Sequence, residues 1–426
     1  MNDPPTICII GAGIAGLSCA YYLEKQGYAP LLLEREERPG GRVKTDSYHG
    51  YLMDQGFQVL LSSYEEVNKI IRPYELEGHA FPSGARVRYG GKWHTFSNPL
   101  RHPWSFWQAS RLPFAQFSDL VKTGWLYLKS ATSNRRPLFS QEQELAIPFL
   151  EKQGVSKPFI AHFLRPFFGG VFLDPELRVN ADLFCSILHF FAEGKAFLPK
   201  GGMEQLPKKM AAKLKATRQR YGVRVSAVEG QRVFLANGEE IQADKIVIAT
   251  SGKQAGQLLP HLPQLSYRSS CTIYCAVDRG YWPADSQLLH LNGDEGGPIS
   301  SLAAVSAVEP SYAPTGKWLL SLSVLDPLWQ QKKEEELQEA IAEQLGHWFG
   351  LSRRHYQQLK SYFIEEALPE QSHPPLLQKR YGVDRQPDIY LCGEYVDQAS
   401  LNGAAASGRE VAQKVHEAID RLKQAC

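Results

Sequence analysis

Three glycines near the start of the chain have the spacing of a loop that binds a nucleotide diphosphate. Gly11, Gly13 and Gly16 follow a short apolar run in a Gly-x-Gly-x-x-Gly pattern, and an apolar helical pattern begins directly after them. In this pattern the first glycine permits a tight turn, the second lets the backbone approach a pyrophosphate, and the third lets the helix pack close to the strand. The start of the helix, around Ile14 and Ala15, directs unpaired N–H groups and a partial positive charge at the phosphates.

A carboxylate follows at the position where such a fold binds a ribose. A predicted helix, 14–26, leads into a second apolar run, 31–33, which ends at Glu34, 18 residues beyond Gly16. An acid in this place accepts hydrogen bonds from ribose hydroxyls and disfavours a 2′-phosphate, which argues against NADP. We therefore assign Glu34 and its neighbour Arg35 to the predicted nucleotide site. The alternative for Glu34 is a solvated side chain at the end of a strand.

Two further glycine loops extend this site. Gly40 and Gly41 form a loop whose backbone can pass close to a ligand, and Arg42 is a candidate partner for the diphosphate. The alternative for this loop is a surface turn with a solvated arginine. Gly56, followed by Phe57, predicts close approach of the backbone to a large flat group, although a β-bulge would also explain the glycine.

The composition narrows the class of protein. A chain of 426 residues is long enough for two domains or one large composite domain. Its net charge of +2 is too small to indicate a nucleic-acid-binding protein. Seven scattered cysteines without a C-x-x-C pair argue against a metal site and a disulfide framework, and favour a reducing, cytoplasmic compartment. The chain shows no signal-peptide pattern and no apolar run long enough to span a membrane.

Aromatic residues are concentrated in residues 93–129, mixed with lysines and arginines. This pattern is compatible with the lining of an apolar pocket, with an interfacial helix on a bilayer, or with helices that bury their aromatics in the core. The following apolar stretch 163–173 is typical of a pocket wall or of core. A peripheral membrane contact therefore stays open at this point.

The remaining pattern alternates between strands and helices. Gly90-Gly91 and Asn237-Gly238 predict hairpin turns, a helix is predicted over 204–220, and a strand is predicted at 223–225. Near the C-terminus a short strand ends in a Gly-Glu pair, and a helix starts at small residues after a loop. The residues that carry this last pattern are Gly393, Glu394, Asn402, Gly403 and Ala404.

These separated pieces together resemble the flavin-dependent amine oxidase superfamily, which includes phytoene desaturases and protoporphyrinogen oxidase. The resemblance implies that Gly393 and Glu394 contact the ribityl and pyrophosphate part of FAD. It also implies that the helix start at Gly403 and Ala404 faces the pyrimidine end of the flavin, and that the strand with Val225 brings a backbone amide to the adenine. A helix end near the pyrimidine edge would stabilise the anionic reduced ring.

The resemblance also implies an α/β fold with two domains. One is a Rossmann-like FAD-binding domain of the glutathione-reductase type, interrupted in sequence, with predicted ranges 1–80, 200–265 and 376–426. The other is an α+β substrate domain with a mixed sheet flanked by helices, predicted at 81–199 and 266–375.

The implied function is an FAD-dependent oxidoreductase that transfers a hydride from a substrate C–H bond to flavin N5. The apolar segments favour a dehydrogenase or desaturase acting on a bulky, polyene or lipid-like small molecule. Within the family, an amine oxidase is the competing function, with Tyr395 nearest in sequence to the place of its aromatic cage. Two further alternatives differ from this chemistry. One is a non-redox flavoprotein with an isomerase or binding role, and the other is an NAD enzyme without flavin. Residues 396–401 contain no cysteine, so we expect non-covalent FAD. No catalytic side chain is assigned.

Overall fold

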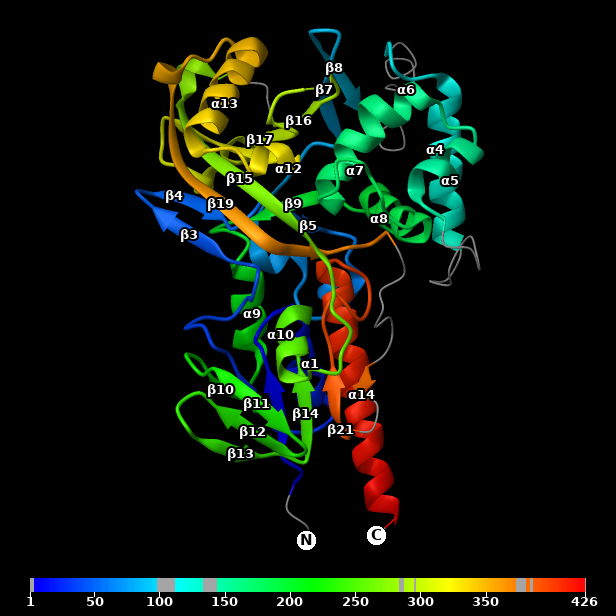
Figure 1. The fold of residues 1–426 in the computed structure, drawn as a ribbon, viewed down its shortest axis with the longest axis vertical. Helices are drawn as coiled ribbons and strands as arrows, with labels where there is room; N and C mark the ends of the chain where they lie inside the picture. Colours follow the sequence, from blue (N-terminus) through cyan, green and yellow to red (C-terminus); the bar gives the residue numbers. More distant parts are fainter. Residues whose placement is uncertain are drawn as a thin grey trace.

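The computed structural model describes residues 4–97, 112–132, 144–282, 287–294, 296–372, 381–383 and 386–425. They form two lobes stacked along the long axis of the molecule, with both chain ends in the lower lobe of the view (Figure 1). Residues 98–111 of the predicted aromatic segment, and the predicted domain boundary at 376, lie outside the described residues.

The lower lobe is built on a six-stranded sheet that is parallel except at one edge. The buried strands carry runs of Ile, Val and Leu, as expected where helices cover both faces of a parallel sheet. The central neighbours of β1 are β2 and β14, paired in parallel register. The strand order is β10 (Arg218–Arg220), β2 (Leu31–Leu33), β1 (Ile7–Ile10), β14 (Lys245–Ile248), β21 (Gln386–Leu391) and β20 (Gly382–Val383).

Two helices pack closely against each other beside this sheet. They are α1 (Ile14–Lys25) and α14 (Leu401–Ala425). The hydroxyl of Ser18 donates to the carbonyl of Ala405 at 2.7 Å. A Cβ atom at Gly408 would lie 2.3 Å from the carbonyl oxygen of Ala15, so only glycine permits this approach. The contact fixes the start of the last helix against the start of the first.

The predicted helix over 204–220 is wrong in its second half. Helix α9 covers Gln205–Lys213, and the chain then extends into β10, which pairs in parallel with β2. The carboxylate of Glu24 accepts the backbone N–H groups of Lys215, Ala216 and Thr217 and so holds the turn between the two elements. Sheet pairing therefore overrides the helical preference of this segment.

A small antiparallel sheet and a helix complete the lower lobe. The predicted turn at Asn237-Gly238 is confirmed, with Gly238 at a φ of +89° between two paired strands. The elements are β11 (Val225–Glu229), β12 (Arg232–Leu235), β13 (Glu240–Gln242) and α10 (Gly252–Leu258).

The upper lobe contains a seven-stranded mixed sheet. One face of the sheet packs against α13 (Glu334–Phe349), and the predicted Gly90-Gly91 hairpin is confirmed between β7 and β8. The strand order is β19 (Tyr356–Pro369), β15 (Tyr267–Asp278), β18 (Lys317–Val324), β17 (Ser301–Ala304), β16 (Leu289–Asn292), β7 (Gly84–Tyr89) and β8 (Lys92–Ser97).

A cluster of helices covers the other side of the upper lobe (Figure 1). Its core is dominated by phenylalanine, with Phe159, Phe168 and Phe184 almost fully buried. The helices are α4 (Phe117–Thr132), α5 (Ala146–Lys152), α6 (Lys157–Phe159), a π-helical turn η2 (Ile160–Leu164), α7 (Arg165–Phe172) and α8 (Ala181–Glu193).

Short elements join the two lobes. The hairpin strands are β3 (Thr45–Tyr48) and β4 (Tyr51–Asp54), and a three-stranded sheet is formed by β5 (Leu60–Leu61), β9 (Ala196–Pro199) and β6 (Gly78–Ala80). The remaining helical segments are α2 (Glu65–Asn68), η1 (Pro73–Leu76), η3 (Arg279–Tyr281), α11 (Val305–Val308), η4 (Pro310–Tyr312), α12 (Pro327–Gln330) and η5 (Arg353–His355).

The six-stranded sheet draws its strands from sequence ranges predicted for the FAD-binding domain, and the seven-stranded sheet from the other ranges. The exact domain boundaries stay a prediction. Within the part of the chain that the structure describes, no helix is long and apolar enough to cross a membrane.

Candidate functional site

A cavity of about 930 Å³ runs from the glycine turn after β1 into the helical part of the upper lobe. Its lower end is lined by the carboxyl ends of β1, β2 and β14 and by the segment before α14. Ligands of open parallel sheets bind at this edge. Its upper end lies between the seven-stranded sheet and helices α4, α7 and α8.

The three glycines of the first turn have different surroundings. Gly11 has a φ of +108°, and a Cβ atom there would lie 2.8 Å from the carbonyl oxygen of Ala249. A Cβ atom at Gly16 would lie 2.0 Å from the carbonyl oxygen of Gly11. No heavy atom lies within 4 Å of the corresponding position at Gly13, which lines the cavity. Gly11 and Gly16 therefore serve the packing of the turn, whereas Gly13 leaves open space for a ligand.

The carboxylate of Glu34 is tied to this turn. One of its oxygens accepts the N–H of Ala12 at 2.7 Å, and the other accepts the N–H of Glu36 at 3.0 Å. Glu34 is only 7% exposed, so the alternative of a solvated side chain is wrong. The backbone N–H of Val223 donates to the Glu34 carbonyl at 2.8 Å and brings the segment before β11 to the same place.

The second glycine loop is joined to the C-terminal part of the site by an ion pair. The guanidinium of Arg42 pairs with the carboxylate of Glu394 and donates to the carbonyl of Ala367 at 3.0 Å. Burial tends to lower the pKa of Arg42, but the neighbouring Glu394 carboxylate outweighs burial and raises that pKa. Arg42 is therefore a permanent cation that is paired rather than solvated, and it faces the cavity.

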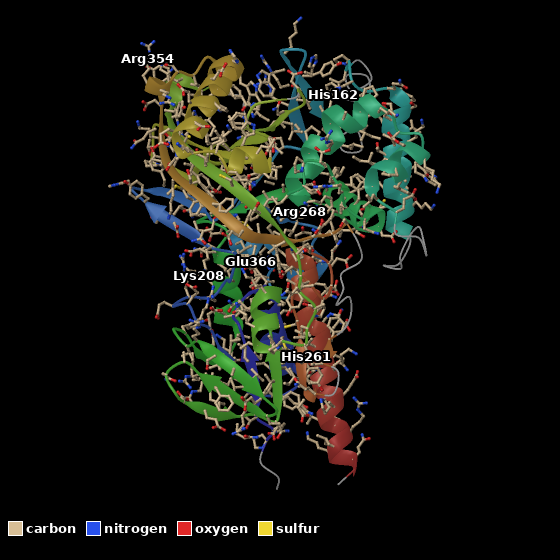
Figure 2. The ribbon with its side chains drawn as sticks, in the orientation of Figure 1. His162, Lys208, His261, Arg268, Arg354 and Glu366 are labelled. Carbon is tan, nitrogen blue, oxygen red and sulfur yellow. The ribbon has the colours of Figure 1, made fainter. Side chains whose placement is uncertain are left out.

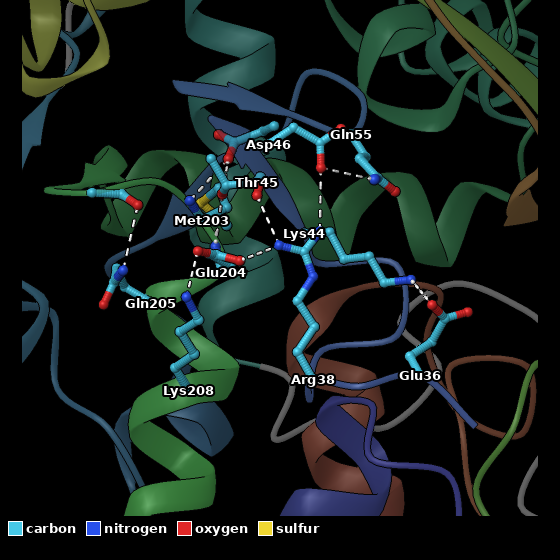
Figure 3. Close-up of polar contacts among 12 residues, drawn as sticks. Glu36, Arg38, Lys44, Thr45, Asp46, Gln55, Met203, Glu204, Gln205 and Lys208 are labelled. Carbon is cyan, nitrogen blue, oxygen red and sulfur yellow. Dashed lines mark hydrogen bonds and ion pairs between the residues drawn. The ribbon is translucent and has the colours of Figure 1, made fainter. Parts of the chain in front are cut away.

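A network of polar side chains holds both ends of the loop that carries Gly40 and Gly41. Arg38 donates to the carbonyl of Thr45 at 3.0 Å, to Glu204 at 2.8 Å and to Asp46 at 3.2 Å (Figure 3). Lys44, on the other side of the glycines, lies 3.6 Å from the carboxylate of Glu36. The loop is therefore fixed before and after its glycines.

The buried carboxylate of Asp54 lies in the same junction. It accepts the hydroxyl of Thr45, the backbone N–H of Met203 at 2.9 Å and the hydroxyl of Tyr312 at 2.9 Å. Burial raises the pKa of Asp54 to about 6, although its three donors act in the opposite direction. Asp54 thus connects the hairpin β3–β4, the start of α9 and the upper lobe.

Two further ion pairs cross between parts of the molecule at the base of β15 and β19. Arg268 lies 2.9 Å from the carboxylate of Asp174 in the helical cluster. Glu366 lies 3.0 Å from Lys253 of α10 in the lower lobe. Both Arg268 and Glu366 lie where the two lobes meet (Figure 2). The Arg268–Asp174 pair joins the sheet to the helical cluster within the upper lobe, and the Glu366–Lys253 pair joins the upper lobe to the lower lobe.

The start of α14 approaches the cavity through a tight turn. Gly393 donates its N–H to the hydroxyl of Ser407 at 2.9 Å. The side chain of Asn402 accepts the N–H of Glu66 at 2.9 Å, and a Cβ atom at Gly403 would lie 1.9 Å from the carbonyl oxygen of Gln398. Asn402 and Gly403 thus shape the turn from behind rather than facing the cavity.

The structure brings most of the predicted cofactor residues to one cavity. Those that line it are Gly11, Gly13, Ile14, Ala15, Glu34, Arg35, Gly40, Gly41, Arg42, Gly56, Phe57, Val225, Gly393, Glu394 and Ala404. Gly16, Asn402 and Gly403 do not line it. The contact of each residue with a cofactor stays a prediction.

Some residues that line the cavity were not predicted from the sequence. Thr250 and Ser251 follow β14, and Ala399, Ser400 and Leu401 precede or begin α14. The signal for the first pair was present, because β14 is a buried parallel strand and its carboxyl end must lie at the binding edge. The loop before α14 carries no comparable signal.

Comparison with known proteins then decides the family. A model of the family described as "Flavin containing amine oxidoreductase" matches residues 14–416. The chain belongs to this family. Members of the flavin-containing amine oxidoreductase family are FAD-dependent oxidoreductases, so the protein is an enzyme of this class with FAD as its cofactor.

Individual relatives within the family are distant. The chain is 21% identical to coproporphyrinogen III oxidase of Bacillus subtilis (strain 168), over 74% of this chain and 76% of the relative. It is 23% identical to an L-amino-acid oxidase of Protobothrops flavoviridis, over 67% of this chain and 61% of that relative. The fold is similar to an oxidoreductase from Methanosarcina mazei, with a TM-score of 0.73 at 18% identity, covering 96% of this chain and 100% of the other.

The geometry of the cavity fits the cofactor of the family. The open space at Gly13 and the N-terminus of α1 suit a pyrophosphate, and the Glu34 carboxylate suits a ribose. The cavity continues past Arg42 and Gly56 to the start of α14, which leaves a continuous path for the flavin part of FAD. Beyond this point the lining changes character and becomes apolar.

Proposed function

We propose that the protein is an FAD-dependent dehydrogenase or desaturase of a bulky, hydrophobic, polyene or lipid-like substrate. The observation that carries this proposal is the apolar lining that helices α4, α7 and α8 give to the upper cavity. The residues of α4, α7 and α8 and of β15, β17 and β18 that line the cavity are all uncharged, whereas Lys195, Arg224 and Glu366 are charged lining residues outside these elements. Phenylalanines of the helical cluster, such as Phe163 and Phe167, form much of this lining.

In this proposal the side chains orient the cofactor and the substrate and exclude water from the cavity. When bound, FAD accepts a hydride from a substrate C–H bond. The apolar walls exclude water and hold the substrate by burial of its surface, and the fixed loop at Gly40 and Gly41 with Arg42 orients the cofactor. Formation of a C=C bond also removes a proton from the carbon next to the one that loses the hydride, and this proton must pass to a base. We assign no side chain to that role.

The amine oxidase alternative is supported by the L-amino-acid oxidase relatives. A substrate ammonium needs a carboxylate or an aromatic cage. Tyr395, the aromatic nearest in sequence to that position, is 1% exposed, does not line the cavity, and packs within 2.5 Å of a Cβ position on Gly393. Tyr395 therefore supplies no aromatic cage, and the carboxylates of Glu366 and Glu394 on the cavity wall are paired with Lys253 and Arg42. These surroundings favour the hydrophobic substrate over the amine.

The decisive experiment is anaerobic reduction of the bound flavin, followed by its absorbance. Each class is added in turn: a C20 polyene, a long-chain lipid, primary amines, L-amino acids and a porphyrinogen. Bleaching by the polyene or the lipid is the expected result. Bleaching by amines or amino acids alone would replace the proposal with the alternative, and substrate turnover without bleaching would assign a non-redox role.

We also propose that FAD is held non-covalently and that the protein resides in a reducing compartment, the cytoplasm. Cys271 is the one cysteine among the described residues that line the cavity, and residues 396–401 contain none. The described cysteines are buried free thiols. Acid precipitation should release all of the flavin into the supernatant, and flavin retained in the pellet would contradict this assignment.

We further propose that the protein contacts a membrane surface through the exposed apolar side of helix α4. Val121, Trp125 and Leu128 form an apolar stripe that is about half exposed, at 49%, 51% and 59%. Lys122 of the same helix donates to the carbonyl of Gly154, and Lys129 lies over the ring of Trp125, so the apolar stripe rather than these cations carries the proposal. The opposite side of α4 lines the cavity through Leu120, Thr123, Gly124 and Tyr127. A hydrophobic substrate could then pass from a lipid surface into the cavity.

A further inference from the structure

Four hydroxyl side chains of the seven-stranded sheet face the upper cavity, opposite a largely apolar lining from the helices. Ser270 and Thr272 of β15, Ser301 of β17 and Ser323 of β18 line the cavity, and their exposures lie between 2% and 8%. Thr272 is the register partner of Ser323, and Ser323 is the register partner of Ser301. These three residues therefore form a row across adjacent strands, the hydroxyl row, which spans about 10 Å.

The hydroxyl row has no partner within the described protein. Thr272, Ser301 and Ser323 form no side-chain hydrogen bond with another described residue, and neither does Ser270. By contrast, Ser306 near this sheet accepts the N–H of Leu319 at 2.7 Å. These hydroxyls are open to the cavity and can bond to water or to a polar group of a ligand. A ligand that displaces the water without replacing its hydrogen bonds leaves the row unsatisfied, which costs binding free energy.

The surroundings of the row restrict that group to a neutral one. The lining residues of β15, β17 and β18 and of helices α4, α7 and α8 include no charged side chain, so an ammonium or a carboxylate bound among them would lack an adjacent counter-charge. The charged lining residues nearest in sequence are Lys195, after α8, and Glu366 of β19. A hydroxyl side chain both donates and accepts, and so suits an alcohol or a carbonyl oxygen. Ser270 extends the polar strip toward the predicted flavin loop, because its oxygen lies 4.0 Å from a Cβ position on Gly56.

We propose that the hydroxyl row of Thr272, Ser323 and Ser301 binds a neutral oxygen function, an alcohol or a carbonyl, on an otherwise hydrophobic substrate. The inference rests on the proposed function and narrows its substrate class to oxygen-bearing polyenes or isoprenoid-like lipids. The row sets the position of the substrate along the cavity, and therefore which C–H bond lies over the flavin. These residues are determinants of specificity and take no part in the hydride transfer.

The test uses the FAD-loaded protein and one C20 polyene skeleton with different end groups. The probes are retinol, retinal, retinoic acid, retinylamine and the corresponding hydrocarbon, and binding is measured by quenching of protein fluorescence. Retinol and retinal should bind about tenfold or more tightly than the hydrocarbon, as expected for the gain of one or two satisfied hydrogen bonds. The charged acid and amine should bind no better than the hydrocarbon.

A triple variant removes the row while keeping its volume nearly constant. In Thr272→Val with Ser301→Ala and Ser323→Ala, the alcohol and the hydrocarbon should bind within about twofold of each other, and hydrocarbon affinity should persist. The matched control is Ser321→Ala, which lies on the same strand and face as Ser323 but does not line the cavity. If the triple variant fails to retain FAD, Ser323→Ala alone should still reduce the preference severalfold.

The outcomes separate this inference from the function on which it rests. An unchanged preference in the triple variant, or equal binding of alcohol and hydrocarbon by the unmodified protein, would overturn the hydroxyl row as the recognition site while leaving a hydrophobic substrate standing. Tightest binding of the acid or of the amine would overturn the neutral class. Absence of binding by every member of the series to FAD-loaded protein would overturn the proposed function itself.

Discussion

The guanidinium of Arg42 is paired with the carboxylate of Glu394, although the two residues lie near opposite ends of the chain. The pair closes the cavity between the Gly40-Gly41 loop and the end of β21, and so makes one binding site from two distant segments. Its removal therefore gives the first prediction.

Arg42→Met should leave the Glu394 carboxylate without its partner in the cavity wall. We expect a loss of about 2 kcal/mol in FAD binding free energy, because a charged group left without its partner keeps its desolvation cost. Isothermal titration of the FAD-free protein with FAD measures the loss. Arg232→Met, which removes an exposed ion-pair partner in the small sheet, is the control and should have little effect. Equal FAD affinity in both variants would contradict the assigned role.

Gly13 and Gly16 should respond to substitution in different ways. Gly13→Val extends into open space beside the cavity, so the FAD-free protein should keep its melting temperature while FAD affinity falls more than about tenfold. Gly16→Ala places a methyl group 2.0 Å from the Gly11 carbonyl oxygen and should reduce the free energy of unfolding itself by roughly 1–3 kcal/mol. Thermal melts with and without FAD distinguish the two effects. A Gly13→Val protein that is purified with full flavin would refute the diphosphate site.

A side chain added at Gly170 should block the substrate without disturbing the cofactor. Gly170 lines the upper cavity on α7, and no atom lies within 4 Å of its Cβ position. In Gly170→Leu we expect at least about tenfold slower flavin reduction by a bulky substrate, with unchanged FAD content. Gly256→Leu is matched to it, because this helical glycine has equally open surroundings but does not line the cavity. Equal rates in the two variants would remove the helical cluster from the substrate path.

Asp54 should give the protein a pH-dependent stability. Its pKa of about 6 in the folded protein exceeds the ordinary value of about 3.9, so the folded state binds more protons between these values. The free energy of unfolding should therefore fall by about 3 kcal/mol as pH rises from roughly 4 to above 6. Urea unfolding at several pH values measures this slope.

Asp54→Asn should abolish that slope, since the amide does not titrate. Asp46→Asn is the comparison, because neighbouring donors lower the pKa of Asp46 to about 2, although burial opposes this shift. The contribution of Asp46 has the opposite sign and is lost as pH falls through its folded pKa. A slope between pH 4 and 6 that survives in Asp54→Asn would assign it to another group.

The apolar stripe of α4 should determine any association with lipid. The unmodified protein should float with vesicles that contain anionic lipid, and Trp125→Glu should reduce the floating fraction severalfold. Leu328→Glu, which changes a 73% exposed leucine outside α4, should float like the unmodified protein. Absence of flotation, or equal loss in both variants, would assign the stripe to another contact.

The lower lobe was the more predictable part of the molecule, because its signals are local. The glycine turn, the helix after it, and Glu34 follow from spacing alone, and the structure has the helix over Ile14–Lys25. Strand β10 was missed because Arg-Gln-Arg has neither a hydrophobic alternation nor β-branched residues, and its place is set by pairing with β2. The structure of such a segment is determined by the strand with which it pairs, and its own residues do not identify that strand.

The contacts that complete the candidate site were beyond sequence reasoning for a similar reason. Arg42 and Glu394 were both predicted as cofactor-binding residues, but their pairing depends on the packing of segments far apart in the chain. The hydroxyl row depends on the registers of β15, β18 and β17, which bring Thr272, Ser323 and Ser301 side by side. In the sequence these residues are isolated small polar positions in apolar strands.

The division of the cofactor cavity between the first and last parts of the chain also orders events on the ribosome. β21 lies inside the six-stranded sheet, next to β14, so this sheet is incomplete until that strand has been made. The ribosome adds 382 residues between Gly11 and Gly393, which takes about 20–75 s at ordinary translation rates. Throughout that interval the nascent chain carries a half-built nucleotide site with an exposed strand edge. The complete FAD cavity therefore exists only after β21 has been made, so we expect FAD to be captured after that strand is synthesised.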